Sequence, residues 1–220
     1  MHNHFDYIIV GGGSAGCVLA NRLSNDFNAE VLLLEAGPKD RNPLIHMPAS
    51  ISRLIEHKTL NWNYTTTAQT AMNERQIPVP RGRTLGGSSS INAMVHIRGQ
   101  AQDYDEWRDM GNDGWGYSDV LPLFKYSETN HGANIDEGFH GFKGPLQIND
   151  RAYTHPLSDL FVESAEAVGL AKNNDFNGHN QLGVGRYQVA QSNGKRCSSA
   201  TAYLHPAADR PNLSVITNAK

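Results

Sequence analysis

The chain has 220 residues, which is enough for one large domain or for a domain with an appended lobe. Its hydrophobic fraction of 39% argues against disorder, and its formal net charge of -3, without any basic block, argues against nucleic-acid binding. The only cysteines, Cys17 and Cys197, exclude a disulfide framework and a cysteine-rich zinc module. We therefore expect a small-molecule partner, no nucleic acid and no metal site.

The N-terminal residues 1–6 lack the basic and apolar regions of a secretory signal peptide. No stretch approaches the roughly 18 uninterrupted apolar residues of a transmembrane helix. We expect a soluble, cytoplasmic protein without a transmembrane segment. Peripheral attachment of a longer parent protein to the inner face of a membrane stays compatible with this expectation.

The first 35 residues have the pattern of a βαβ unit. Residues 5–10 form a β-branched and aromatic run that ends at three glycines, as a buried strand entering a tight turn would. Residues 14–24 repeat apolar side chains at helical spacing, which indicates an amphipathic helix. Residues 31–34 are fully apolar and predict a second buried strand, which Glu35 and the residues after it close.

The rest of the chain gives weaker signals. Residues 39–80 are rich in Pro, Asn and Thr, and turn signals dominate residues 138–149. The elements expected from periodicity are a short helix at 49–55, helices at 102–110, 118–128 and 156–168, and a strand at 212–217. Because the chain stops soon after this last strand, we interpret it as truncated.

The sharpest motif is the G-x-G-x-x-G sequence of residues 11–16, which lies between the first predicted strand and helix. Gly11 permits the tight turn, Gly13 lets a pyrophosphate approach the backbone, and Gly16 lets helix and strand pack closely. The free N–H groups at the helix N-terminus attract phosphates. Glu35 follows Gly16 by 19 residues, where a carboxylate can accept hydrogen bonds from ribose hydroxyls. The pattern predicts dinucleotide binding.

Two alternatives share these residues. A G-x-S-x-G pattern places Ser14 where a hydrolase nucleophile would stand, but that design builds an oxyanion loop upstream and only ten residues precede Gly11. A nicotinamide-dependent reductase is the other alternative, although no Tyr-x-x-x-Lys pair occurs. The ADP motif alone does not separate a nicotinamide from a flavin.

The remaining chemistry-bearing side chains favour ordinary structural roles. The ten histidines are scattered, and only His2 and His4 lie close together, which does not make a metal site. Cys17 is interpreted as a small packed residue rather than a redox thiol. Two Trp/Tyr pairs are interpreted as core or loop anchors rather than cofactor contacts, namely Trp62 with Tyr64 and Trp115 with Tyr117.

A second cluster of small residues spans residues 81–95. Together with residues 5–36 it closely resembles the glucose-methanol-choline (GMC) oxidoreductases, which are flavoproteins that oxidise alcohols. The branch of choline dehydrogenase and bacterial alcohol dehydrogenase is the nearest. The similarity covers nearly the whole chain, because it continues at residues 113–117, 121–125, 127–128, 194–203 and 210–213.

The resemblance implies an α/β fold of the FAD/NAD(P)-binding, Rossmann-like type, with a βαβ ADP-binding unit at the N-terminus and part of an irregular substrate-side lobe. Residues 1–220 would form the N-terminal FAD-binding portion. Its expected divisions are the ADP-binding unit at 1–37, a flavin-contacting extension with helices at 38–150, and the start of the substrate-side lobe, returning toward the FAD domain, at 151–220.

The motif and the resemblance together assign residues to FAD. The ADP half is expected at Gly11, Gly13, Ser14, Ala15, Gly16, Glu35 and Ala36, and the pyrophosphate, ribityl chain and flavin at Thr84, Gly86, Gly87, Ser88, Asn92, Ala93, Met94 and Val95. Some relatives attach FAD through a histidine just before the motif asparagine. Ile91 occupies that position here, so we expect non-covalent FAD. His96 departs from the Tyr or Phe usual in relatives.

By the same resemblance, the parent protein would oxidise choline or another primary alcohol to the aldehyde by hydride transfer to flavin N5. The base, a histidine with a second His or Asn, lies in the C-terminal part of a family chain more than twice this length. No catalytic residue is therefore assigned here, and the isolated chain is expected to be inactive. A dinucleotide-binding fragment without catalysis of its own is the alternative. The substrate, electron acceptor and oligomeric state stay open.

Overall fold

The computed structural model describes residues 4–219, so His2 and the rest of residues 1–3 lie outside the described residues. The chain forms two units, one from Met1–Met94 with Gly194–Lys220 and one from Val95–Asn193. After residue 193 the chain returns to the first unit and adds a strand to its sheet. The expected division by cofactor role stays a prediction.

The first unit contains short elements connected by long loops. Before the chain leaves it, its elements are β1 (Tyr7–Val10), α1 (Ser14–Leu23), β2 (Val31–Glu35), α2 (Pro43–His46), η1 (Pro48–Ser50), α3 (Ile51–Ile55), β3 (Tyr64–Thr65), η2 (Thr70–Met72), β4 (Pro78–Val79) and η3 (Gly87–Ser90). After the return they are β9 (Lys195–Arg196), η5 (Ala200–Leu204), α7 (His205–Ala207) and β10 (Leu213–Thr217).

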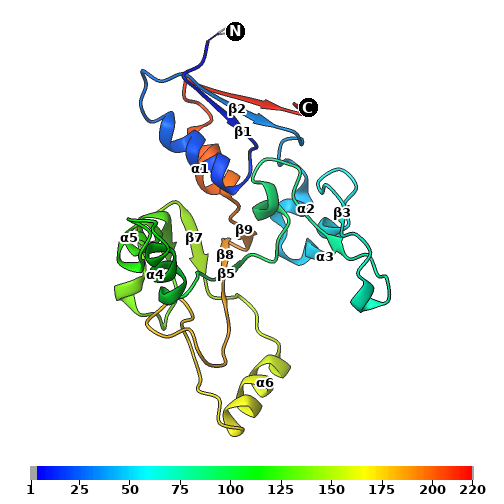
Figure 1. Cartoon of the computed structure of the whole chain (residues 1–220), viewed down its shortest axis with the longest axis vertical. Coiled ribbons are helices and arrows are strands. Elements are labelled where there is room, and N and C mark those ends of the chain that lie inside the picture. The colour runs from blue at the N-terminus through cyan, green and yellow to red at the C-terminus, as the bar shows by residue number, and fades with distance from the viewer. Residues whose placement is uncertain (1–3, 220) are drawn as a thin grey trace. The chain divides into compact units, whose positions relative to one another are not determined.

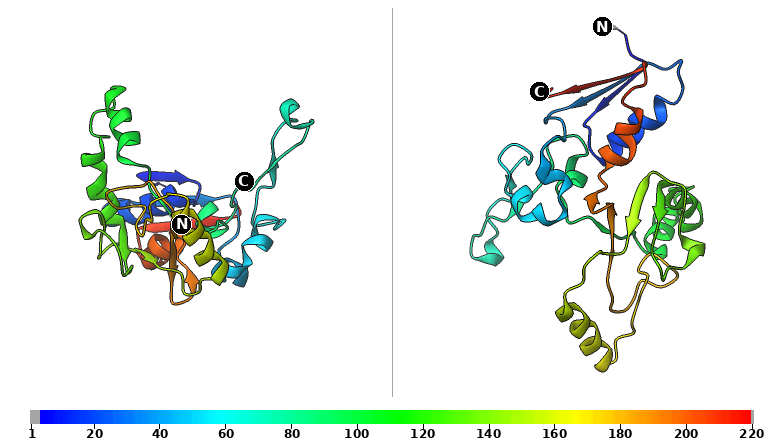
Figure 2. Two further views of the ribbon diagram at one scale, coloured as in Figure 1. Left: turned by 90° about the horizontal axis from the view of Figure 1, so that it is seen from below. Right: turned by 180° about the vertical axis from the view of Figure 1, so that it is seen from behind.

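Its central feature is a parallel sheet with the strand order β1-β2-β10 (Figure 1). Tyr7 and Leu213 both pair with Val31, so β2 lies between the first and the last strands of the unit. Helix α1 and the C-terminal helical segment pack together on one face of this sheet (Figure 2). The predicted βαβ unit, the predicted strand at 212–217 and the α/β class are thereby confirmed.

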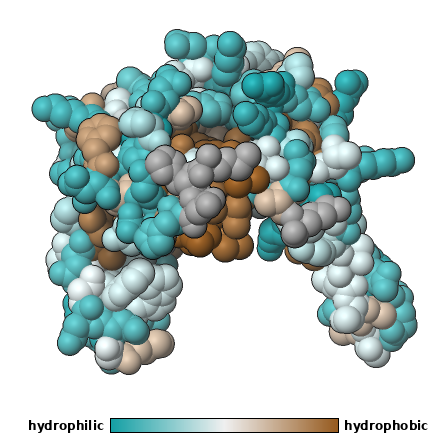
Figure 3. All heavy atoms as spheres, turned by 90° about the horizontal axis from the view of Figure 1, so that it is seen from above, coloured by the Kyte–Doolittle hydropathy of each residue, from teal (hydrophilic) through white to brown (hydrophobic). Residues whose placement is uncertain are grey.

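The two strands of the βαβ unit differ in burial. β2 is almost fully buried, as predicted, with Val31 and Leu33 at 0% exposure. The expectation that β1 is equally buried is wrong for this chain, because Ile8 is 60% and Val10 is 83% exposed. The reason is that β1 is an edge strand and the helices cover one face of the sheet. Figure 3, which looks onto the end of the chain carrying this sheet, shows hydrophobic surface among hydrophilic residues.

Residues 39–80 are more ordered than the sequence indicates. The expected helix at 49–55 is present as a 3-10 turn followed by α3, and α2 precedes it. A buried cluster joins these turns to the second glycine-rich segment through Ile45, Leu54, Leu60 and Ile91. This core holds the loops that surround the candidate site.

The second unit combines helices with a mixed sheet. Its elements are β5 (Val95–His96), α4 (Ala101–Asp109), α5 (Tyr117–Ser127), β6 (Glu128–Asn130), η4 (Glu137–Phe139), β7 (Leu146–Asn149), α6 (Pro156–Ala167) and β8 (Gln188–Ser192). The strands follow the order β5-β8-β7-β6, in which only β6 and β7 are parallel. The three predicted helices are confirmed to within a residue, whereas β7 lies in a stretch expected to contain turns.

Helix α6 is present where the sequence predicts a helix, but most of its apolar face is not packed against the rest of the unit. Leu157 and Phe161 are 66% and 69% exposed, Val168 at the C-cap is 80% exposed, and the buried residue of the helix is Val162. The helical spacing was therefore a correct guide to secondary structure and did not show which side of the helix is covered. Within residues 4–219, no helix combines the length and apolar character needed to cross a bilayer.

Candidate functional site

A pocket of about 720 Å³ lies at the carboxyl ends of β1 and β2 in the first unit. Three segments distant in sequence line it, namely the glycine turn with β2, the β3–β4 ribbon, and the second glycine-rich segment. The lining residues are Val10, Gly11, Gly13, Ser14, Leu34, Glu35, Ala36, Trp62, Tyr64, Arg81, Gly82, Gly87, Ser88 and Ala219. The fold thus brings seven predicted site residues together: Gly11, Gly13, Ser14, Glu35, Ala36, Gly87 and Ser88.

The glycines of the first motif have different structural roles. Gly11 has φ +98°, a left-handed conformation that favours glycine. A Cβ on Gly16 would lie 1.9 Å from the carbonyl oxygen of Gly11, so α1 could not pack so close to the turn with any side chain there. A Cβ on Gly13 would meet nothing nearer than the Cα of Gly87 at 4.0 Å. Gly16 therefore serves packing, and Gly13 leaves space in the pocket.

Helix α1 begins at this pocket with its first backbone N–H groups uncapped by a side chain. Gly13 is the N-cap residue, and the first turn contains no acidic side chain. Because four N–H groups at a helix start lack partners within the helix and carry a partial positive charge, they favour an anion. The arrangement suits a phosphate group at the start of α1.

Glu35 braces the glycine turn as well as lining the pocket. Its carboxylate accepts hydrogen bonds from the N–H of Gly12 at 2.8 Å and from the N–H of Gly37 at 2.7 Å. The side chain is only 6% exposed. A carboxylate has about four acceptor positions, so two backbone bonds leave capacity for further donors such as hydroxyl groups. The sequence motif did not indicate this bracing role.

The second glycine-rich segment packs directly against the first. The N–H of Gly86 donates to the carbonyl of Gly12 at 2.7 Å. A Cβ on Gly87 would lie 2.7 Å from the Cα of Gly13, and Gly87 has φ +53°. Two stretches of backbone therefore meet without side chains between them, and both stay accessible from the pocket.

Several residues predicted to contact the cofactor do not line the pocket; in the first unit these are Ala15, Gly16, Thr84, Gly86, Asn92, Ala93 and Met94. Thr84 is fully buried and its hydroxyl donates to the carbonyl of Pro38 at 2.9 Å, which fixes the loop. Val95 belongs to the second unit. Ile91, at the position of covalent attachment in some relatives, is 2% exposed and packs in the core cluster.

Arg196 is a supporting residue that sequence reasoning missed. Its guanidinium donates to the carbonyls of Ile45, Ser89 and Asn92 at 2.8, 3.1 and 2.8 Å and to the side-chain oxygen of Asn92 at 2.9 Å. Burial lowers the pKa of Arg196 to about 10. It connects the return segment to the glycine-rich segment across more than a hundred residues of chain, a distance over which no local sequence signal exists.

Cys17 lies in α1 directly behind the glycine turn. Its side chain is 0% exposed, and its thiol donates to the carbonyl of Gly12 at 3.3 Å. Burial raises the pKa of the Cys17 thiol to about 12. Because thiolate is the reactive form, these features fit the expected packing role and not a redox role.

The structure separates the two Trp/Tyr pairs that the sequence analysis interprets in the same way. Trp62 and Tyr64 are 42% and 52% exposed, so they are not core residues, and both line the pocket. Trp115 instead contacts Trp107 in the second unit, with ring centroids 5.7 Å apart. Residue types and spacing do not separate the two pairs, because only the fold brings β3 to the end of β2.

The second unit holds a buried charged cluster around Glu128. One Glu128 oxygen accepts from Arg98 at 2.6 Å and lies 2.8 Å from Nδ1 of His140, and the other lies 2.9 Å from Nε2 of His96. Nε2 of His140 lies 2.9 Å from Asp175. His96, the departure from the usual Tyr or Phe, therefore serves as a partner of Glu128.

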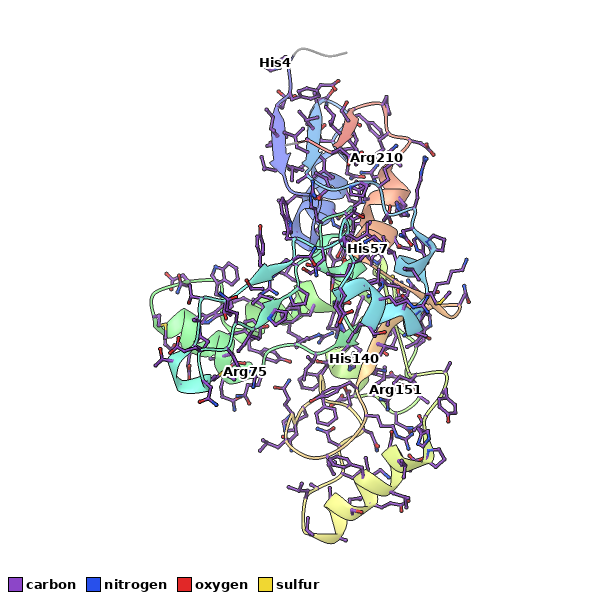
Figure 4. All side chains as sticks on the ribbon, turned by 90° about the vertical axis from the view of Figure 1, so that its right-hand side faces the viewer. His4, His57, Arg75, His140, Arg151 and Arg210 are labelled. Atoms are coloured by element: carbon purple, nitrogen blue, oxygen red, sulfur yellow. The ribbon has the colours of Figure 1, made fainter. Side chains whose placement is uncertain are left out.

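This cluster stabilises the charged forms of His140, Glu128 and Asp175. Burial alone would lower the pKa of His140, but its bonds to Asp175 and Glu128 raise it to about 9. Burial alone would raise the pKa of Glu128, but its bonds with His140 and His96 and the charge of Arg98 hold it well below its usual range. Figure 4 labels His140 among the strands of this unit. The charges neutralise one another inside the protein.

Comparisons with known proteins agree with this arrangement. The chain is 53% identical over 216 residues to an alcohol dehydrogenase [acceptor] of Pseudomonas putida, covering 98% of this chain and 39% of that protein. It is 43% identical over 211 residues to an oxygen-dependent choline dehydrogenase of Rhizobium etli, covering 96% and 38%. The chain thus spans about two fifths of the length of these relatives.

A solved structure gives the same result for the fold. An FAD-dependent oxidoreductase from Chaetomium thermophilum superposes with a TM-score of 0.89 at 31% identity, covering 97% of this chain and 38% of that one. The family described as GMC oxidoreductase matches residues 5–220. The predicted resemblance is confirmed: the chain belongs to the GMC oxidoreductase family.

Proposed function

We propose that this chain binds the FAD of an oxidoreductase that oxidises a primary alcohol, such as choline, to the aldehyde. The observation that carries the proposal is the pocket at the start of α1, where the first glycine turn, Glu35 and the second glycine-rich segment meet. Family membership and the similarity to alcohol and choline dehydrogenases support the reaction class.

The residues present fit a dinucleotide. The space in front of Gly13 is open, and any side chain there would project into it. The uncapped α1 N-terminus favours the pyrophosphate, and Glu35 retains acceptor capacity for ribose hydroxyls. Arg83 adds a cation near this site; among the described residues, no hydrogen-bond partner lies at its buried Nε.

Each segment has a distinct task in this proposal. Gly11 and Gly13 admit the pyrophosphate close to the backbone, while Glu35 and Ala36 face the adenosine. Gly87 and Ser88 continue the pocket toward the flavin half. When bound, FAD supplies the hydride acceptor for the alcohol carbon. FAD is non-covalent in this proposal, since Ile91 has no nucleophilic atom and is buried.

The isolated chain is proposed to bind FAD without turning over alcohol. Oxidation needs a group that removes the hydroxyl proton, and a general base contributes about 10²–10⁴-fold. Within the described part of the chain, the residues that line the pocket include no histidine, and Glu35 is already engaged by two backbone N–H groups. Bleaching of supplied FAD by choline or a primary alcohol under anaerobic conditions would contradict this point.

The binding proposal is tested with Gly13→Val and, as a control, Gly138→Val in the second unit. We expect Gly13→Val to weaken FAD binding at least about 100-fold, because the side chain occupies the pyrophosphate space. Circular dichroism should stay unchanged in both variants. Isothermal titration with FAD measures affinity, and acid precipitation should release all bound flavin. Wild-type affinity in Gly13→Val would overturn the proposal.

A further inference from the structure

A buried residue at the end of the second glycine-rich segment has a backbone conformation that its side chain disfavours. Met94 has φ 62° and is 6% exposed. Within residues 4–219, the other non-glycine residues with positive φ are all exposed, namely Asn63, Asn73, Glu74, Asn193 and Asn218. Asparagine tolerates the left-handed region because its short polar side chain can bond locally, whereas methionine has no such compensation. The conformation of Met94 therefore requires support from its surroundings.

The side chain of Asn92 supplies this support. Its Oδ1 accepts a hydrogen bond from the N–H of Met94 at 3.0 Å. The same oxygen accepts a second bond from Nη1 of Arg196 at 2.9 Å. Since both partners are donors, the oxygen of the amide and not its nitrogen must face them. One side-chain oxygen thus links the strained residue to the return segment of the chain.

Arg196 holds Asn92 from a fixed position. It is 2% exposed, and its guanidinium also donates to the carbonyls of Ile45, Ser89 and Asn92. Ile45 belongs to the buried apolar cluster of the first unit. Nε bonds to Ile45 and Nη1 bonds to the other acceptors, so two nitrogens of one rigid planar group are used. The core thereby fixes both the turn before Met94 and the oxygen that supports it.

The supported segment continues the cofactor pocket. The N–H of Asn92 donates to the carbonyl of Ser88, which lines the pocket, at 2.9 Å. Asn92 and Ala93 are exposed, whereas Met94 is buried directly after them. Because φ of Met94 sets how the following chain is directed relative to this exposed turn, its left-handed value decides which backbone groups the turn presents.

We propose that Arg196 is a positioning residue for the flavin half of the dinucleotide. Through Asn92 it keeps Met94 in the left-handed conformation, and it thereby holds the exposed turn of Asn92 and Ala93 ready for the flavin. The inference rests on the proposed function. Without Arg196, Met94 relaxes to an ordinary conformation, and bound FAD must restore the strained one at a cost in affinity. The adenosine half contacts the first glycine turn and is not affected.

The test compares FAD with ADP, which lacks the flavin, by titration calorimetry on the 220-residue chain. Arg196→Met keeps an unbranched side chain and removes the donors. We expect it to weaken FAD binding about tenfold, the factor that corresponds to the usual cost of one left-handed non-glycine residue. ADP affinity should equal that of wild type, and the visible circular dichroism of bound flavin should change. Arg196→Lys should not restore the affinity, because one nitrogen replaces two.

A glycine at position 94 separates the positioning role from a general loss of structure. Glycine adopts positive φ without support, so adding Met94→Gly to Arg196→Met should recover most of the lost FAD affinity. The same rescue should follow in Asn92→Ala, which removes the shared oxygen but leaves the backbone bonds of Arg196 in place. This second background keeps the test available if Arg196→Met does not fold. Absence of rescue would overturn the proposal.

Arg210→Met is the matched control. Arg210 also belongs to the return segment and is labelled in Figure 4. Its guanidinium donates to the carbonyl of Asn21 and the hydroxyl of Ser24, at the end of α1 and not at Asn92. Its loss should lower the melting temperature and leave both the FAD affinity and the flavin spectrum unchanged. A loss of FAD affinity equal to that of Arg196→Met would contradict a specific role for Arg196.

The outcomes separate this inference from the proposed function. If wild type binds neither FAD nor ADP, the proposed function fails. If wild type binds both, Gly13→Val weakens both, and Arg196→Met binds FAD like wild type, only the positioning role is wrong. Equal losses of FAD and ADP affinity in Arg196→Met would show that Arg196 supports the fold in general, and they would also overturn the inference.

Discussion

The pocket of the first unit lies between glycine backbones, whereas the buried cluster around Glu128 in the second unit consists of charged side chains that bond to one another. Around the pocket, Gly13 and Gly87 bring two chain segments together without side chains, and backbone groups remain accessible. Around Glu128, each carboxylate oxygen is already bonded to a cationic or titratable partner. The first arrangement suits a ligand and the second suits internal cohesion.

This difference shows that buried charge alone does not identify a functional site. The strongest pKa shifts of histidine and glutamate belong to His140 and Glu128, whose bonds are satisfied within the protein. The proposed cofactor pocket contains mostly glycines, small residues and aromatic rings. Structural ion-pair networks also shift pKa values. The geometry around a group must therefore decide whether its shifted pKa indicates a functional site or an internal ion pair.

The largest expected effect comes from breaking the charged cluster. Glu128→Ala leaves Arg98 and His140 buried without their carboxylate, and loss of one member of a buried pair costs about 3–5 kcal/mol. Urea unfolding followed by circular dichroism measures the loss. Asp109→Ala is the control, because its ion pair with Arg108 is exposed and should contribute less than about 1 kcal/mol. Equal effects in the two variants would contradict a cohesive role for the cluster.

An intermediate effect separates the two kinds of glycine in the first unit. Gly16→Ala places a methyl group 1.9 Å from the Gly11 carbonyl, so we expect a loss of about 3 kcal/mol, the upper end of the range for overpacking. Gly13→Ala meets no atom closer than 4.0 Å and should change stability by less than about 1 kcal/mol while weakening FAD binding. Thermal melting with and without FAD distinguishes them. If Gly13→Ala were the less stable variant, the division between packing and binding glycines would be wrong.

The smallest effect concerns pH. Because the pKa of His140 is raised to about 9 in the folded state, its contribution is complete below its unfolded value near 6.5 and is lost as pH rises through 9. Stability should fall by up to about 2 kcal/mol between pH 7 and 9.5. Urea midpoints at several pH values measure this fall. His140→Gln should flatten the profile over that interval, and an unchanged slope would exclude His140 as its source.

Sequence reasoning was most successful where the signal is local. The strand, glycine turn and helix of residues 7–23 follow from β-branched residues, glycines and helical spacing within one short stretch. The helices at 101–127 were placed to within a residue for the same reason. Sequence was less successful at burial, because the apolar faces of β1 and α6 are exposed, and a periodic pattern does not show what covers it.

The βαβ unit, the glycine motif and the family can be predicted from the sequence, since each depends on residue types at fixed short spacings. Tertiary structure decided that Glu35 braces the turn, that Trp62 and Tyr64 reach the pocket, and that Arg196 anchors the second glycine-rich segment. The His140 cluster likewise joins residues that lie 12 to 35 positions apart in the sequence. The physical reason is that such contacts depend on where the folded chain brings distant segments together, and no local propensity encodes that position.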